Sequence, residues 1–286
     1  GHERVTLGDG TKMGNIVSVA AGANFNLAVS DDGTVYAWGL NASGSLGLNS
    51  DYASTSPYYV PQKVKDVDGK SALGTSEETG KIVRVYAYGN AAAAISERGQ
   101  VYVWGESTSN MLGARRNSAY YLYPHKVPGI DNAMDVYFTD GNMLILTADG
   151  MLYVSGSQKN GFVGTGASTD VAAYPQPMVI QASADGTVPA RYQGGVVDAG
   201  MGKNQIVFMT MEPDDNVVTG VTIDPGTNTA AVVAGGKDLL KHLYLLGTNK
   251  NGVLSDAAAD GATLERPAEY DYFTGTEYAR LVELYQ

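Results

Sequence analysis

Short apolar runs separated by turn residues recur along the chain, and the same order of runs is found four times. In each copy two apolar runs follow one another closely and precede a third run, and in the first three copies a turn that contains Gly joins the second run to the third. The first copy occupies 16–22, 25–30 and 33–39. Runs rich in Val, Ile and Tyr that are bounded by Gly, Asn and Asp are typical of strands. The pattern therefore predicts an all-β fold with three strands and a long loop in each repeat.

The four copies agree in spacing. Each third run ends at a Gly, and an apolar residue follows that Gly at a constant distance. The glycines are Gly39, Gly105, Gly156 and Gly247, and the apolar residues are Leu46, Leu112, Val163 and Leu254. Constant spacing in several places indicates a repeat array. We expect these glycines to occupy turns that require a positive φ or a close backbone approach.

The first copy resembles the RCC1 repeat family. The matching residues are Asp32, Gly33, Tyr36, Trp38, Gly39, Asn41, Gly44, Leu46 and Gly47. The family's second strand carries a His, and this chain has other residues at that position, namely Phe25, Ala91, Asn142 and Gln205. The resemblance covers about 16–286 and implies a β-propeller in which each repeat supplies the strands of one blade.

The repeat boundaries predict four recognisable blades and a partial fifth. Residues 1–15 are interpreted as a tag remnant and a lead segment, and 16–286 as one array with a hairpin insertion at about 212–241. The repeats span about 16–81, 82–132, 133–195, 196–277 and, for the partial one, 278–286. Because 281–285 has the pattern of a first strand with no strands after it, we expect an open arc or an array completed by another chain. Pairing of 281–285 with 5–7, which would close a small ring, is the alternative.

Composition narrows the classes of partner. The chain has no Cys, which excludes disulfides and Cys-based metal sites. The formal net charge is −11, and this acidity argues against a nucleic-acid partner, because phosphate binding needs a basic face. No apolar run approaches the length of a membrane-spanning helix.

Motifs for catalysis or cofactor binding are incomplete. Gly74, Gly80 and Lys81 imitate a phosphate-binding loop, but Ile82 replaces the Ser or Thr that would hold magnesium. The segment 66–77 imitates a calcium loop without the required ligand set. His125 and His242 have no neighbouring carboxylate pair in the sequence. We therefore predict no enzymatic activity, no cofactor and no metal ion.

Aromatic residues are the strongest functional signal. Tyrosines gather in the predicted loop after each third run, where we expect them either to bind a partner or to cover the gaps between blades. The candidate partner-binding residues are Tyr52, Tyr58, Tyr59, Tyr120, Tyr121, Tyr123 and Tyr174. Trp38 and Trp104 end equivalent strands, and we favour a packing role for them over stacking on a sugar.

These observations predict a non-enzymatic module for protein–protein interaction, self-assembly or structural support within a larger protein. Binding of glycans, as in an adhesin or lectin, is the alternative. The segment 218–225 looks like the first strand of a bacterial Ig-like module. It favours a bacterial protein that is secreted or exposed at the cell surface over a cytoplasmic one.

Overall fold

The computed structural model describes residues 5–50, 55–115, 117–163, 171–180, 191–192, 194–213, 218–224, 229–234, 239–248 and 263–269. Over these residues the chain forms four antiparallel sheets of four strands each and two separate strand pairs. Each sheet is built from strands in chain order, so that every repeat folds on itself. The predicted partial fifth repeat, 278–286, lies outside the described residues.

The first two sheets have the same plan, and a short 3-10 helix follows the third strand in each. The first sheet comprises β1 (Ile16–Ala21), β2 (Phe25–Ser30), β3 (Val35–Gly39) and β4 (Tyr58–Lys63), with η1 (Ala42–Gly44). The second comprises β5 (Ile82–Tyr88), β6 (Ala91–Ser96), β7 (Val101–Glu106) and β8 (Tyr120–Lys126), with η2 (Thr108–Asn110).

The other two sheets follow the same order, with an interruption in the last. The third comprises β9 (Ala133–Thr139), β10 (Asn142–Thr147), β11 (Leu152–Ser157) and β12 (Val171–Pro177). The fourth comprises β15 (Val196–Met201), β16 (Gln205–Pro213), β19 (Leu239–Thr248) and β20 (Thr263–Glu269). The separate pairs are β13 (Val179–Ile180) with β14 (Arg191–Tyr192), and β17 (Val218–Asp224) with β18 (Thr229–Ala234).

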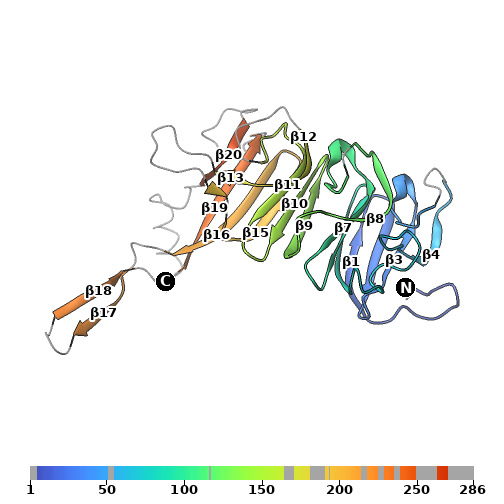
Figure 1. Cartoon of the computed structure of the whole chain (residues 1–286), viewed down its shortest axis with the longest axis horizontal. Coiled ribbons are helices and arrows are strands. Elements are labelled where there is room, and N and C mark those ends of the chain that lie inside the picture. Colours follow the sequence, from blue (N-terminus) through green and yellow to red (C-terminus); the bar gives the residue numbers. More distant parts are fainter. Residues whose placement is uncertain are drawn as a thin grey trace, which may run out of the picture.

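The four sheets stand in a row in chain order, like successive blades of a propeller (Figure 1). The first strands of neighbouring sheets lie against each other, β1 with β5, β5 with β9 and β9 with β15. These strands therefore form the inner side of the arc. The first and fourth sheets lie at opposite ends of the row (Figure 1). The predicted all-β propeller with four blades is confirmed.

Each sheet has one strand more than the three runs of the sequence pattern. The loops predicted after the third runs end in an outer strand, namely β4, β8, β12 and β20. Proline is present in all four, for example Pro61 in β4 and Pro124 in β8. Proline has no N–H to give to a ladder, so it is tolerated on an edge strand that pairs on one side only. A proline-containing edge strand does not show the alternation that identifies a strand in a sequence.

Successive sheets are joined by the same contact. Trp104 of the second sheet is fully buried, and its Nε1 donates a hydrogen bond of 2.9 Å to the carbonyl oxygen of Ser45 in the first sheet's turn. At the corresponding position of the third sheet, the Ser155 hydroxyl donates to the carbonyl oxygen of Met111, at 2.5 Å. The packing role predicted for Trp104 is confirmed.

The fourth sheet carries an insertion in place of a tight turn. In the first and third sheets, Ser30 and Thr147 donate to Asp32 and Asp149 in the turn that joins the second and third strands. In the fourth sheet, β16 and β19 instead remain paired as far as Pro213 and Leu239. Beyond them the β17–β18 hairpin stands clear of the row of sheets (Figure 1). The Thr210 hydroxyl, at the position of Ser30, is consequently buried without a hydrogen-bond partner among the described residues.

Candidate protein-interaction surface

The tyrosines singled out in the sequence lie on the outer strands rather than in loops. Tyr58 and Tyr59 lie in β4, Tyr120, Tyr121 and Tyr123 in β8, and Tyr174 in β12, whereas Tyr52 lies outside the described residues. Their environments differ. The side chain of Tyr59 is 85% exposed and that of Tyr174 is 39% exposed, while Tyr121 is buried.

Tyr121 and Tyr123 are brought together by a histidine. The ring of His125 lies 5.0 Å from that of Tyr121 and 4.7 Å from that of Tyr123, measured between centroids. The Tyr121 hydroxyl accepts from the Arg115 backbone N–H at 2.9 Å and donates to the Arg115 carbonyl oxygen at 3.0 Å. These contacts fix the loop before β8, so Tyr121 serves packing and loop geometry.

His125 makes this cluster sensitive to pH. Burial, with the charge of Arg115 as a smaller cause, lowers the pKa of His125 to about 4. The unfolded chain binds the proton at an ordinary pKa of about 6.5. Since the unfolded state holds the proton more tightly, the contribution of His125 to the free energy of unfolding falls as the pH drops from about 6.5 to about 4 and is constant below that.

Replacement of His125 by Gln is expected to remove this pH dependence. Gln62 and Gln176 occupy the same register position in β4 and β12, so the change uses a residue that the fold already accepts there. Urea denaturation at pH 7 and pH 4.5 should show a smaller loss of stability in His125→Gln than in the parent chain. Equal losses in the two proteins would show that His125 titrates normally in the folded state.

The inner strands of all four sheets carry a β-bulge at the same place. The pairing register skips one residue near the start of β1, β5, β9 and β15. A bulge leaves its extra residue unpaired and re-aims the neighbouring side chains. The skipped residues are all apolar, and their exposed fractions lie between 42% and 56%. They are Val17, Val83, Met134 and Val197.

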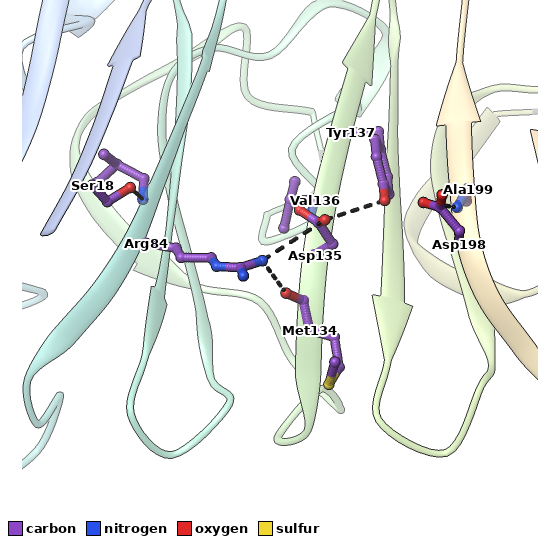
Figure 2. Close-up of polar contacts among 9 residues, drawn as sticks. Ser18, Arg84, Met134, Asp135, Val136, Tyr137, Asp198 and Ala199 are labelled. Atoms are coloured by element: carbon purple, nitrogen blue, oxygen red, sulfur yellow. Dashed lines mark hydrogen bonds and ion pairs between the residues drawn. The ribbon is translucent and has the colours of Figure 1, made fainter.

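A polar residue follows each of these apolar residues. The four polar residues are Ser18, Arg84, Asp135 and Asp198, and we call the eight residues together the inner-strand row. Figure 2 shows the polar members side by side on neighbouring strands. The Ser18 hydroxyl accepts from the Val85 backbone N–H at 3.2 Å and so ties the first sheet to the second.

Arg84 is the cation of the inner-strand row. Its Nη1 lies 3.8 Å from Oδ2 of Asp135 and donates to the carbonyl oxygen of Met134 at 3.2 Å (Figure 2). The Tyr137 hydroxyl donates to the same Asp135 oxygen at 3.2 Å. Asp198 accepts from the Ala199 N–H at 2.9 Å and has no ion pair within the described residues. Asp198 is thus an exposed carboxylate of the row without an oppositely charged neighbour among the described residues.

Two tyrosines next to the inner-strand row are held neutral. Burial raises the pKa of Tyr86 far above its usual value, and Asp135 acts in the same direction. Burial also raises the pKa of Tyr137, again with Asp135 contributing. The Tyr86 hydroxyl lies close enough to Asp135 for its charge to affect the pKa of the tyrosine. It makes no hydrogen bond of good geometry among the described residues. These tyrosines stay protonated at physiological pH and act as neutral polar groups.

The sequence motifs that imitate binding loops are explained by local structure. Asp66 is buried, and its carboxylate accepts from the Ser76 hydroxyl at 2.7 Å and the Thr79 hydroxyl at 3.0 Å. It therefore binds its own loop. Among the described residues, no group of three or more His, Cys, Asp or Glu side chains could hold a metal ion. No helix in this part of the chain has the length and apolar character needed to cross a membrane.

Comparison with known proteins finds a repeat family at the start of the chain. Residues 16–45 and 32–90 match two models of the regulator of chromosome condensation (RCC1) repeat. The chain is 30% identical over 178 residues to protein pim1 of Schizosaccharomyces pombe, which covers 56% of this chain and 31% of pim1. It is 31% identical over 157 residues to the ultraviolet-B receptor UVR8 of Arabidopsis thaliana, covering 54% of this chain and 32% of UVR8. The chain thus matches about a third of the length of these relatives.

A solved structure shows the same fold. Prp20p of Saccharomyces cerevisiae superimposes with a TM-score of 0.57 at 21% identity, over 89% of this chain and 50% of that one. Prp20p is a protein with binding properties towards Gsp1p and histones. At this identity the likeness establishes the fold, a β-propeller like that of Prp20p, and the match to RCC1 repeat models lies within residues 16–90.

Proposed function

We propose that this chain is the non-enzymatic, protein-binding part of a larger protein and that the inner-strand row is its contact surface. The observation that carries the proposal is the exposure of four apolar bulge residues at equivalent positions. Folding alone does not require an apolar side chain to face water at the same place in four repeats. Exposed apolar groups that are gathered on one surface and flanked by polar ones are characteristic of protein interaction sites.

The charges of the inner-strand row indicate the chemistry of the partner. Arg84 is engaged with Asp135, whereas Asp198 has no ion pair among the described residues. A fitting partner presents apolar side chains to the valines and methionine and a cationic group to Asp198. The net charge of −11 favours the approach of a cationic protein surface. Prp20p, which has the same fold, binds Gsp1p and histones, and this supports a protein rather than a small molecule as partner.

The double substitution Val83→Ser and Met134→Ser is expected to weaken partner binding at least about thirtyfold, since truncated hot spots cost at least about 2 kcal/mol. The fold should remain intact because both side chains are exposed. A partner captured from the source organism would be purified and titrated by calorimetry. Val171→Ser, an exposed position on β12, is the matched control.

Two results would contradict this assignment. The first is that the captured protein binds the double variant as tightly as the parent chain. The second is that a glycan array shows specific binding that the same variant abolishes. Glycan binding remains the second candidate because a groove of about 610 Å³ lies beside β4. Its lining combines the rings of Tyr36 and Tyr58 with polar Asp9, Gln62 and Lys63, a mixture suited to sugars.

We further propose a secreted or cell-surface location in a bacterium. The support is the likeness of 218–225 to the first strand of a bacterial Ig-like module. The relatives described above are eukaryotic and lend no support to a bacterial origin. Sequencing of the complete gene, with a search for a secretion signal or a wall anchor, would test this location.

A further inference from the structure

An arginine of the chain itself fills a cation site between the second and third sheets. Arg84 of β5 reaches across to β9, where its Nη1 lies 3.8 Å from Oδ2 of Asp135 and donates to the carbonyl oxygen of Met134 at 3.2 Å (Figure 2). Burial raises the pKa of Tyr86, and the charges of Asp135 and Arg84 also affect it, so its hydroxyl lies beside this pair. This first site therefore offers a carboxylate, the carbonyl oxygen of a bulge residue and a tyrosine hydroxyl to one guanidinium group.

The carboxylate of Asp198 in β15 repeats that of Asp135 in β9. Each residue directly follows the one that the pairing register skips, which is Val197 in β15 and Met134 in β9. Each carboxylate accepts through Oδ1 from the N–H of the next residue, at 2.9 Å in Asp198 and 3.0 Å in Asp135. The two carboxylates therefore have the same local geometry, and the carbonyl oxygen of Val197 corresponds to that of Met134.

A tyrosine hydroxyl completes the same set of groups between the third and fourth sheets. Tyr137 in β9 corresponds to Tyr86 in β5, and its hydroxyl donates to Oδ2 of Asp135 at 3.2 Å. Burial raises the pKa of Tyr137, and Asp135 and, to a smaller extent, Asp198 act in the same direction. The hydroxyl therefore lies between the two carboxylates (Figure 2). The carboxylate, the carbonyl oxygen and the hydroxyl of the first site are thus all repeated in a second one.

The second site has no cation among the described residues. The position that Arg84 holds in the second sheet is taken in the third by Asp135, which is itself a carboxylate. Asp198 is exposed, and its Oδ2 accepts no hydrogen bond and makes no ion pair in this part of the chain. The second site is bounded by β9 and β15, so it lies within the row of sheets and not at either end. Its carboxylate is therefore arranged like one that holds an arginine, without the arginine.

We propose that the second site binds the guanidinium group of an arginine carried by the protein partner, in the arrangement that Arg84 shows at the first site. This inference rests on the inner-strand row being the contact surface. A guanidinium group suits the site better than an ammonium group, because its planar fork of N–H donors reaches a carboxylate and a carbonyl oxygen together. The exposed side chains of Met134 and Val197 flank the site and are suited to contact the methylene groups of the same arginine.

The test uses N-acetyl-arginine amide as the probe, titrated into the complete nitrogen-15-labelled chain and followed by the backbone amide signals. The signals of Asp198 and Ala199 are expected to move and to saturate. Asp198→Asn, which keeps the shape of the side chain, should weaken this binding at least about fivefold, because hydrogen bonds to an ionised group are the stronger ones. N-acetyl-lysine amide should bind the parent chain at least about threefold more weakly, since it lacks the planar fork. The control Glu77→Gln removes an exposed negative charge from the loop before β5 and should leave the binding unchanged.

Three results of this titration would overturn the proposal. They are unmoved Asp198 and Ala199 signals in the parent chain, unchanged affinity in Asp198→Asn, and a lysine probe that binds as tightly as the arginine probe. No protein partner takes part in the titration. Its failure is therefore distinct from failure of the proposed contact surface, which the captured partner and the double substitution Val83→Ser and Met134→Ser decide.

The variant Arg84→Ala tests whether the first site is a true copy of the second. The substitution empties the first site, and because the side chain it truncates is 56% exposed, the fold should be kept, as circular dichroism would check. The arginine probe is expected to gain a second place of binding, seen as movement of the Asp135 and Val136 signals that is absent from the parent chain. A folded variant without this new binding would overturn the proposal, because the carboxylate, carbonyl oxygen and hydroxyl would then not suffice to hold a guanidinium group.

Discussion

Replacement of Trp104 by Ala is expected to lower the free energy of unfolding by about 3–5 kcal/mol, as for other large-to-small changes in a core. The indole is fully buried between the first and second sheets, and its Nε1 bonds to the Ser45 carbonyl oxygen. The substitution removes this hydrogen bond and leaves a cavity at the junction of two blades. Urea denaturation followed by circular dichroism would measure the loss.

Trp38→Ala is the matched comparison, because the two residues occupy the same position in neighbouring repeats. Trp38 is partly exposed and makes no equivalent hydrogen bond among the described residues, so a smaller loss on the order of 1–2 kcal/mol is expected. Equal losses would show that Trp38 is as well covered as Trp104 within a single chain.

Replacement of Gly105 by Ala is expected to destabilise the protein by several kcal/mol, enough to unfold much of the second sheet. Gly105 has a φ of +86°, and a Cβ there would lie 2.1 Å from the carbonyl oxygen of Asn90. That oxygen also accepts from the Glu106 N–H at 3.1 Å, so it cannot move away freely. Strain at positive φ costs about 1–3 kcal/mol, and overpacking adds about 1–3 kcal/mol.

The variant Gly89→Ala measures the cost of strain at positive φ without the cost of overpacking. Gly89 also has a positive φ, of +56°, but a Cβ there would meet nothing within 4 Å. Gly89→Ala should lower the free energy of unfolding by about 1 kcal/mol, which is the cost of the backbone conformation alone. If Gly105→Ala were no worse than Gly89→Ala in thermal denaturation, the close approach to Asn90 would be of no energetic consequence.

The role of the glycine that ends each third run could be predicted from the sequence. Gly39, Gly156 and Gly247 share a positive φ with Gly105, and each lies against a carbonyl oxygen just before or at the start of the second strand. This geometry confirms the expectation of turns that need close approach. Strands with regular alternation and tight turns are local features, so their signals survive in a single sequence.

The outer strands and the inner-strand row could not be predicted in the same way. β4 contains Tyr59, Pro61 and Lys63, which read as a polar loop because an edge strand buries little. In the inner strands, a bulge exposes the side chain of Val17, although its neighbour Ile16 is also apolar. Two adjacent apolar residues at the start of every first run were the available signal, since both cannot face the same side of a regular strand. The burial of equivalent residues such as Val19, Val85 and Val136 depends on the neighbouring sheet, and no local pattern contains that information.

The order of strands within the sheets also bears on how the chain folds during synthesis. The first three sheets each use one continuous stretch of chain, so each can form soon after its last strand leaves the ribosome and then serve as a template for the next. The fourth sheet differs, because the stretch between Pro213 and Leu239 must be closed before β19 can join β16. A longer loop lowers the probability that its two ends meet, although the free-energy cost of closing the loop rises only by about 0.6 kcal/mol for each doubling of its length. Among the four described sheets, the fourth is therefore the one whose third strand is expected to join its second strand latest after synthesis.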